Sequence, residues 1–330
     1  MGIDTRIFSI DTFPVPNSWV FEKFLNLSDK LTGQSVSIKS IFNKEDSNPS
    51  MIIYLHTNNR YKFKCFSTGR SGDAVDLIQM LYNLTDRQSA FRKTIDFWEA
   101  GDYESYTVGE LIKTDYEVSE FTLRSWNTDD VTYWTKYNLG SKELEFFNIK
   151  PLASYIFKMI RGEEITYKEF SKHYCYGYFR KDGTLYKIYN PKDKRTKFIK
   201  VKNYIQGHDQ LEYKYDWLII LASLKDLMAF KILGFPIECI APDSENTMIT
   251  HKQLQYYKKR YKFISVMFDN DIAGKKSAMK YNSVYNLPYT LFNVEKDIAD
   301  CVKEHGIDNT KIFLQPQIIE TKNEYIRKNR

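Results

Sequence analysis

Four acidic residues in the second half of the chain lie at or just after apolar runs: Asp226, Glu245, Asp269 and Asp271. Carboxylates that meet at one place repel one another unless a cation shares them, and hard oxygen ligands select Mg²⁺ or Mn²⁺. Asp269 and Asp271 are close enough in sequence to reach one metal where a strand ends, and Gly274 then allows a close backbone approach. We therefore predict a catalytic group of all four carboxylates, with metal ligands Asp226, Asp269 and Asp271.

The sequence Asp-x-Asp-x-x-Gly is by itself a common turn, so two other metal or phosphate motifs must be considered. An EF-hand loop would need an oxygen-bearing side chain at Ala273 and a glutamate at Lys280. A Walker A loop ending at Lys275-Lys276-Ser277 would put its first glycine at Asp269. Both motifs are excluded.

The elements that would position these carboxylates alternate between strand and helix. Apolar runs at 217–222, 236–241 and 263–268 predict buried strands, with helices from 223 to 233 and from about 250 between them. A fourth strand is predicted at 289–292 and a helix after it. This alternation predicts an α/β fold with a parallel sheet, right-handed crossovers and helices on both faces. In such sheets, active groups lie beyond the carboxyl ends of the strands.

This stretch resembles a Toprim domain, the metal-binding fold of bacterial-type (DnaG-like) primases, topoisomerases and some nucleases. Asp269, Asp271 and Gly274 match its Asp-x-Asp-x-x-Gly, and Asp226 matches the Asp of its Glu-Gly-x-x-Asp. Ala222 stands where the family has its acid/base Glu, although phage primases of this kind can carry Ser-x-Lys-Asp here.

The departure at Ala222 leaves the general acid/base group open. Glu245 is either its substitute or an ordinary surface glutamate in a turn. The resemblance also implies that Lys225 holds triphosphate. Asp297 and Asp300, in Lys-Asp-x-x-Asp, are either secondary metal ligands or plain helix caps.

The 330 residues carry a formal net charge of +6, but the positive charge is uneven: residues 180–202 hold nine Lys or Arg against two Asp. An Asp-Gly turn between alternating runs predicts a hairpin here. The segment resembles the amino-terminal half of a primase core, whose Lys-Ile-Tyr-x-Pro is matched from Lys187 to Pro191. The resemblance assigns Lys187, Arg195 and Lys197 to triphosphate or template phosphate. The alternative is a solvated hairpin face.

Residues 42–81 resemble the zinc-ribbon domain of bacterial-type primases, because Pro49-Ser50, Cys65-Phe66 and Gly72-Asp73 match its pattern. The four zinc-ligand positions fall on Ile41, Lys44, Cys65 and Thr68. One thiolate cannot hold a structural zinc ion, so we expect a zinc-ribbon-like fold without zinc.

Around this ribbon, basic residues alternate with aromatic ones. Arg60, Lys62 and Arg70 would suit single-stranded DNA by charge and stacking. The alternation also indicates that Tyr61 and Phe63 fill the core instead.

The predicted organisation is a zinc-ribbon-like domain (1–100), an acidic linker (101–120), the amino-terminal half of a primase core (121–214), and a Toprim domain with C-terminal helices (215–330). The chain contains no Walker A sequence, no signal sequence and no apolar run of membrane-spanning length. Its four cysteines are scattered, with no spacing typical of a disulfide framework or a zinc site. Free thiols are expected in a reducing cytoplasm, which would be that of a bacterial host if the protein is phage-encoded.

The function expected from the resemblance is a DNA primase. It would use nucleoside triphosphates, a single-stranded DNA template, Mg²⁺ or Mn²⁺, and a separate replicative helicase. Two alternatives stay open: a Toprim-family nuclease, and a catalytically inactive primase-like DNA-binding accessory protein. A topoisomerase is disfavoured because no tyrosine stands out as a nucleophile and the chain is short for a strand-passage gate.

Overall fold

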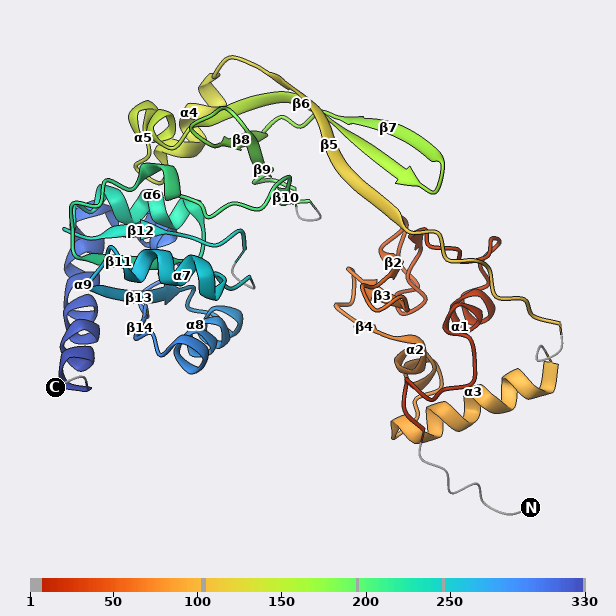
Figure 1. Ribbon diagram of the computed structural model, residues 1–330. Coiled ribbons are helices and arrows are strands. Elements are labelled where there is room, and N and C mark those ends of the chain that lie inside the picture. The colour runs from red at the N-terminus through yellow and green to blue at the C-terminus, as the bar shows by residue number, and fades with distance from the viewer. Residues whose placement is uncertain (1–7, 102–104, 194–195, 245–246, 329–330) are drawn as a thin grey trace. The chain divides into compact units, whose positions relative to one another are not determined.

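The computed structural model describes residues 8–101, 105–193, 196–244 and 247–328 (Figure 1). The chain divides into two compact units. Unit 1 comprises Met1–Glu117 and Lys158–Tyr167, and unit 2 comprises Val118–Phe157 and Lys168–Arg330. No helix among the described residues is both long and apolar enough to cross a bilayer.

Unit 1 contains a four-stranded sheet in the order β1-β2-β3-β4, in which each strand is antiparallel to its neighbour. The strands are β1 (Val36–Ile38), β2 (Met51–Leu55), β3 (Tyr61–Cys65) and β4 (Ser71–Gly72), and the helices are α1 (Asn17–Phe24), α2 (Ala74–Leu81) and α3 (Arg87–Gly101). Tyr61, Phe63 and Cys65 are buried on one face of β3, while Lys64 is exposed on the other. The predicted alternation is confirmed, and the aromatic rings of this strand belong to the core.

A hydrogen-bonded cluster surrounds Cys65. Its thiol donates to Ser40 Oγ at 3.1 Å, and Asp46 accepts from Ser67 Oγ at 3.0 Å and also from Ser50 Oγ. Burial raises the pKa of Cys65, but hydrogen bonds, first from Ser40 and Ser67, outweigh burial and lower that pKa to about 7. These contacts tie the loop before β2 to the loop after β3.

Three long strands have residues in both units: β5 (Thr114–Leu123), β6 (Ile149–Arg161) and β7 (Glu164–Phe170). The structure therefore makes a strand of part of the stretch expected as an acidic linker. Both faces of β5 are largely exposed, and Glu117 pairs with Lys158 at 2.9 Å. A strand exposed on both faces lacks the apolar alternation that would reveal it in sequence.

Unit 2 begins with an antiparallel sheet in the order β10-β9-β8-β6-β5, with β7 beside β6. Its other strands are β8 (Tyr176–Phe179), β9 (Leu185–Tyr189) and β10 (Phe198–Lys200), and helices α4 (Thr128–Thr135) and α5 (Ser141–Phe146) precede β6. Strands β8 and β9 form the predicted hairpin, whose turn includes Gly183 at a φ of 83°. A buried group of aromatic side chains, including Tyr133, Tyr176 and Tyr189, fills the space between this sheet and the helices.

A second sheet in unit 2 is entirely parallel and has the order β12-β11-β13-β14. Its strands are β11 (Trp217–Leu221), β12 (Glu238–Ile240), β13 (Phe263–Phe268) and β14 (Tyr289–Leu291). The helices that alternate with them are α6 (Leu224–Ile232), α7 (His251–Lys258), α8 (Ile272–Tyr285) and α9 (Ile298–Lys328). The predicted parallel sheet is confirmed.

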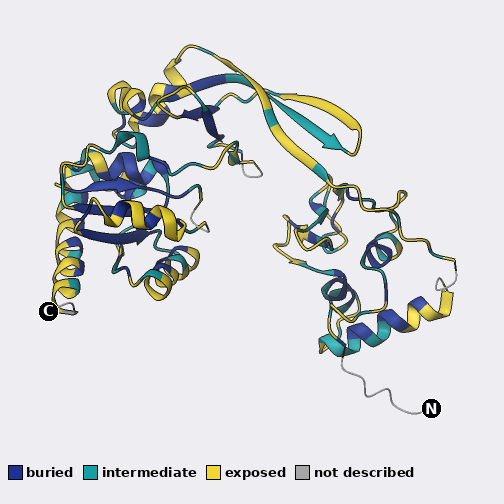
Figure 2. Cartoon of the chain, viewed as in Figure 1, coloured by how far each residue is buried: buried dark blue, intermediate teal, exposed yellow. Residues whose placement is uncertain are grey.

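Helices cover both faces of this sheet, and all residues of β11 and β13 are buried (Figure 2). Residues of α6 and α9 share one core with Ile219, while residues of α7 and α8 share another with Ile220. Successive residues of a strand point to opposite faces, so α6 and α9 lie on one face and α7 and α8 on the other. Helix α9 is broken at Gly306, whose φ is 77°.

Candidate metal centre

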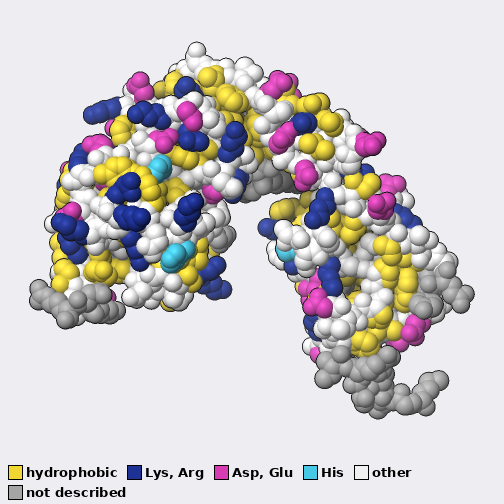
Figure 3. All heavy atoms as spheres, viewed as in Figure 1, with side chains coloured by type: hydrophobic (Ala, Val, Ile, Leu, Met, Phe, Trp, Pro, Cys, Tyr) yellow, Lys and Arg dark blue, Asp and Glu magenta, His cyan; other side chains and the backbone are white. Residues whose placement is uncertain are grey.

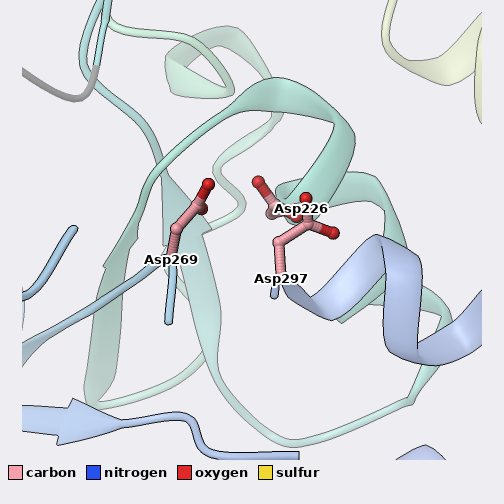
Figure 4. Close-up of side chains that lie close together, drawn as sticks. All are labelled: Asp226, Asp269 and Asp297. Carbon is pink, nitrogen blue, oxygen red and sulfur yellow. The ribbon is translucent and has the colours of Figure 1, made fainter. Parts of the chain in front are cut away.

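Three aspartate side chains meet at the carboxyl edge of the parallel sheet: Asp226, Asp269 and Asp297 (Figure 4). One carboxylate oxygen of each lies within 4.8 Å of the other two. Asp226 lies in the first turn of α6, Asp269 directly follows β13, and Asp297 directly precedes α9. The carboxyl ends of β11, β13 and β14 thus supply one residue each, as expected at the edge of a parallel sheet.

Main-chain contacts hold two of these aspartates, Asp226 and Asp297. Asp226 Oδ1 accepts a hydrogen bond from the Ala299 N–H at 3.3 Å, which links α6 to the start of α9. Asp297 Oδ1 accepts from the Asp300 N–H at 2.6 Å, as a helix N-cap does. The site is therefore held by the beginnings of two helices rather than by mobile side chains.

The electrostatics of the cluster call for a cation. Asp226 is only 4% exposed. Burial, together with the charges of Asp297 and Asp269, holds the pKa of Asp226 well above its ordinary value. All the donor atoms are carboxylate oxygens, which fits Mg²⁺ or Mn²⁺ rather than a softer metal. A divalent ion bound by Asp226, Asp269 and Asp297 would remove this repulsion.

Three lysines surround the carboxylates. Lys296 Nζ lies 3.7 Å from Asp269 Oδ2, and Lys225 Nζ lies 3.9 Å from Asp297 Oδ2. Burial lowers the pKa of Lys225, but Asp297 and Asp226 outweigh it and raise that pKa. Burial lowers the pKa of Lys197, and the nearby charges of Lys225 and Lys296 lower it further. These cations would suit a phosphate ligand.

Asp271, expected as a ligand beside Asp269, caps α8 instead: its Oδ1 accepts from the Gly274 N–H at 2.9 Å, and its Oδ2 lies 3.6 Å from Lys296 Nζ. Among the described residues, Asp271 is not in the group of three carboxylates whose oxygens lie within 4.8 Å of one another. Asp297, expected as a secondary ligand, belongs to that group. Asp300 lies beside it, with Oδ1 at 3.7 Å from Lys225 Nζ.

Lys187 differs most from its expected role as a phosphate ligand. It is only 8% exposed, and its ammonium group donates to the Asp243 carbonyl at 2.5 Å and to Gln206 Oε1 at 3.4 Å. Burial lowers the pKa of Lys187 to about 8. Lys187 points into protein because β9 is buried along its whole length. Lys187 fixes the end of β12 and is not free to bind phosphate.

Two residues missed in the sequence belong to this edge. Lys296 directly precedes Asp297 in Lys-Asp-x-x-Asp, and its position next to a candidate ligand was the available signal. Asp243 follows β12, where its carboxylate accepts from the Tyr204 N–H at 2.7 Å and pairs with Lys200 at 3.0 Å. Asp243 is thus occupied by protein contacts.

Two predicted site residues, Glu245 and Arg195, lie outside the described residues. Ala222 is 8% exposed directly after β11. The general acid/base group therefore stays a prediction.

The basic residues proposed for DNA contact in unit 1 differ in their surroundings. Arg60 donates to the Ile10 carbonyl and pairs with Asp11 at 3.2 Å, so protein groups already hold its guanidinium. Lys62 is half-buried, and Arg70 is exposed with its guanidinium 4.8 Å from the centre of the Phe42 ring. Arg70 is the member of this set that fits a stacking contact best.

No family model matches the chain. Topoisomerase 1-associated factor 1 of Lodderomyces elongisporus is 27% identical over 153 residues, which are 46% of this chain and 12% of that protein. The chain thus spans a small part of that curated protein's length.

Three of the solved structures that resemble the chain are primase fragments. The zinc-binding and RNA polymerase domains of Aquifex aeolicus primase align with a TM-score of 0.44 and 14% identity, covering 94% of this chain and 87% of that one. The primase fragment of the bacteriophage T7 primase-helicase protein gives 0.37 and 11%, covering 84% and 96%. The RNA polymerase domain of Mycobacterium tuberculosis primase DnaG with double-stranded DNA gives 0.36 and 14%, covering 58% and 65%. All three scores lie below 0.5, so the residues of the carboxylate edge carry the assignment of function.

Proposed function

We propose that this chain is a DNA primase of the Toprim type, which makes short RNA primers on single-stranded DNA by metal-dependent nucleotidyl transfer. The observation that carries the proposal is the meeting of Asp226, Asp269 and Asp297 at one sheet edge with lysines beside them. A set of oxygen ligands next to cations suits a reaction in which a metal-bound triphosphate is the substrate.

In this reaction a 3′-hydroxyl attacks the α-phosphate of a nucleoside triphosphate, and pyrophosphate leaves. Divalent cations, when bound, would neutralise charge that develops on the transferring phosphate. Asp226, Asp269 and Asp297 would hold them. Lys296 and Lys225 would hold the β- and γ-phosphates and orient the leaving group, because their ammonium groups already lie next to the carboxylates. Glu245 is proposed as the general base that takes the proton of the attacking hydroxyl.

The order of the modules favours a primase over a nuclease of the same fold. A ribbon-like sheet, a basic hairpin and the parallel sheet follow one another in the chain, as in bacterial-type primases, and a nuclease would not need the first two. The proposed partners are a single-stranded template, nucleoside triphosphates and a separate helicase. The proposed location is the cytoplasm, that of a bacterial host if the protein is phage-encoded.

A second candidate function is an inactive primase-like protein that binds DNA. The specific observation in its favour is Ala222, a buried apolar residue where the family has its acid/base glutamate. The two functions are separated by incubating the purified protein with labelled nucleoside triphosphates and single-stranded DNA, with Mg²⁺ or Mn²⁺ and then with EDTA. Primers that form only with the metal support the primase; DNA binding without any product supports the inactive protein; shortening of end-labelled DNA supports a nuclease.

A further inference from the structure

Helices α7 and α8, which cover the same face of the parallel sheet, carry positively charged side chains and no negatively charged ones. Residues 251–262 contain five Lys or Arg and residues 272–294 contain three, and neither stretch contains an Asp or Glu. Helix α9, on the opposite face, mixes both signs. The seven residues that form the cationic face, as we name it, are Lys252, Lys258, Lys259, Arg260, Lys275, Lys276 and Lys280.

All seven side chains of the cationic face are exposed. Figure 3 shows Lys and Arg side chains gathered over α7. The six lysines among them form no ion pair within the part of the chain that the structure describes, unlike the neighbouring Lys262, which pairs with Asp216 at 2.8 Å. Unpaired, like-charged side chains on adjacent helices repel one another, and a bound polyanion would relieve this repulsion.

Exposed aromatic rings lie within the cationic face. Tyr256 is 37% exposed and Tyr213 is 41% exposed, and their hydroxyls lie 3.1 Å apart. The Arg260 guanidinium lies 3.7 Å from the centre of the Tyr256 ring, which leaves a flat, charged platform at the end of α7. Bases of single-stranded nucleic acid stack on such aromatic and guanidinium surfaces.

The cationic face also reaches the carboxylate edge. Helix α8 begins directly after Asp271, and Lys275 and Lys276 lie in its first turns. At its other end, α8 packs against the start of α7, where the Tyr281 hydroxyl accepts from the Ile249 N–H at 2.8 Å. The lysines of α8 therefore connect the candidate metal centre to the lysines and tyrosines of α7.

We infer that the cationic face binds the phosphate backbone of single-stranded nucleic acid, with Tyr256 and Tyr213 stacking on its bases. The inference rests on the proposed function for the choice of nucleic acid as the polyanion. The aromatic platform and the continuity with the carboxylate edge favour nucleic acid over an anionic membrane surface or an acidic protein.

The test compares three sets of charge-removing substitutions in the full chain. The α7 set is Lys252→Gln, Lys258→Gln and Lys259→Gln; the α8 set is Lys275→Gln, Lys276→Gln and Lys280→Gln; the control set is Lys303→Gln, Lys322→Gln and Arg327→Gln in α9. Each set removes the same charge from exposed helix positions. The affinity for a fluorescent oligo(dT) is measured by anisotropy over a range of salt concentrations in EDTA, so that metal-dependent chemistry plays no part.

The α7 and α8 sets should each weaken binding about tenfold or more at roughly 0.1 M salt. They should also reduce the slope of log K against log salt by about 2, since each phosphate contact on a single strand contributes about 0.7. The α9 set should change neither quantity. Tyr256→Ala should weaken binding roughly tenfold and Tyr256→Phe should not, because the ring does the stacking.

Wild-type affinity and slope in both the α7 and α8 sets would overturn the inference. So would retained oligo(dT) binding in variants that lose binding to phosphatidylserine-containing vesicles, because the face would then serve a membrane. A wild-type protein that binds DNA through this face but makes no primers leaves the inference standing and removes the primase function. Primer synthesis by the wild type, together with unchanged DNA binding in the α7 and α8 sets, would support the primase function and overturn the inference.

Discussion

The backbone N–H of Asn270 donates to the carbonyl of Lys296 at 2.6 Å. This hydrogen bond joins the loop after β13 to the loop after β14, and so places Asp269 and Asp297, the neighbours of these two residues, at the same point of the sheet edge. Because the bond is between main-chain atoms, it depends on the fold and not on the side chains at those positions. The carboxylate cluster is therefore a product of the parallel sheet.

The first prediction concerns how far the carboxylate cluster destabilises the folded protein when no metal is bound. Asp226→Asn should raise the free energy of unfolding in EDTA by on the order of 1–3 kcal/mol, because the raised pKa of Asp226 means that its ionised form is disfavoured in the folded protein. Added Mg²⁺ should stabilise the wild type more than the variant. Urea unfolding with and without Mg²⁺ measures both effects, and Asp216→Asn, at the exposed start of β11, is the control. A variant less stable than wild type in EDTA would contradict the prediction.

The second prediction concerns Lys296. Lys296→Gln should raise the KM for nucleoside triphosphates roughly tenfold, since a charge-assisted contact to phosphate is lost. The same change should lower the Mg²⁺ concentration needed for half-maximal activity, because Asp269 and Asp271 lose their neighbouring cation. Steady-state kinetics at varied triphosphate and Mg²⁺ measure both. Lys303→Gln, a nearby exposed lysine paired with Glu304, should leave both constants unchanged. Equal KM values for wild type and Lys296→Gln would remove Lys296 from the substrate site.

The third prediction uses pH. The pKa of Lys187 is about 8 in the folded protein, against an ordinary value of 10.5, so between these values the unfolded chain binds more protons than the folded one. Stability should therefore rise with pH across this window, by at most about 1.4 kcal/mol per pH unit. Below pH 8 both states are protonated, and the slope from this group vanishes.

The pH prediction is checked by urea unfolding at several pH values. Lys187→Met should show a flatter profile than wild type between about pH 8 and the ordinary lysine pKa of 10.5, while Lys181→Met, at an exposed position in the β8–β9 turn, should follow wild type. Parallel profiles for wild type and Lys187→Met would show that the Lys187 ammonium group is not desolvated.

The fourth prediction concerns unit 1. Elemental analysis of the purified protein should find no stoichiometric zinc, since Cys65 is the single residue at the four ribbon positions able to bind it. Asp46→Ala should lower the melting temperature, because Ser50 and Ser67 lose their acceptor. Cys65→Ser keeps a donor for Ser40 and should have a smaller effect. One zinc per chain, lost in Cys65→Ser, would contradict this account.

Much of the fold of unit 2 could be predicted because its strands are continuous apolar runs. The runs around Ile219 and Val266 predicted buried parallel strands, and the position of Asp226 and Asp269 after them predicted the sheet edge. The sequence does not show that Asp297 lies beside Asp226 and Asp269, because its strand, β14, is short and its loop gives no periodic signal. The position of a carboxylate that lies on a loop cannot be predicted from such patterns and is known only from the structure.

Side-chain direction explains the other differences. The resemblance to a primase core assigned Lys187 to phosphate, and the excess of positive charge in residues 180–202 favoured that role. Neither can tell a buried lysine from an exposed one, and β9 has neither face in solvent. Strand β5 differs in the other direction, because it is exposed on both faces. Its large apolar side chains Tyr116 and Phe121 are exposed, so no buried face gives the sequence an alternating pattern. Where a strand is buried or exposed on both faces, alternation carries no information about its side chains.

The central claim is that Asp226, Asp269 and Asp297 form one metal-dependent nucleotidyl-transfer site. Its most direct test is primer synthesis from labelled triphosphates on single-stranded DNA by wild type, Asp269→Asn, Asp297→Asn, Asp271→Asn and Asp216→Asn. The account predicts metal-dependent primers from wild type and the Asp216 control and none from the Asp269 and Asp297 variants. Asp271→Asn should keep part of the activity, because asparagine still caps α8. Primer synthesis that survives both Asp269→Asn and Asp297→Asn, in folded protein, would show that the reaction takes place elsewhere.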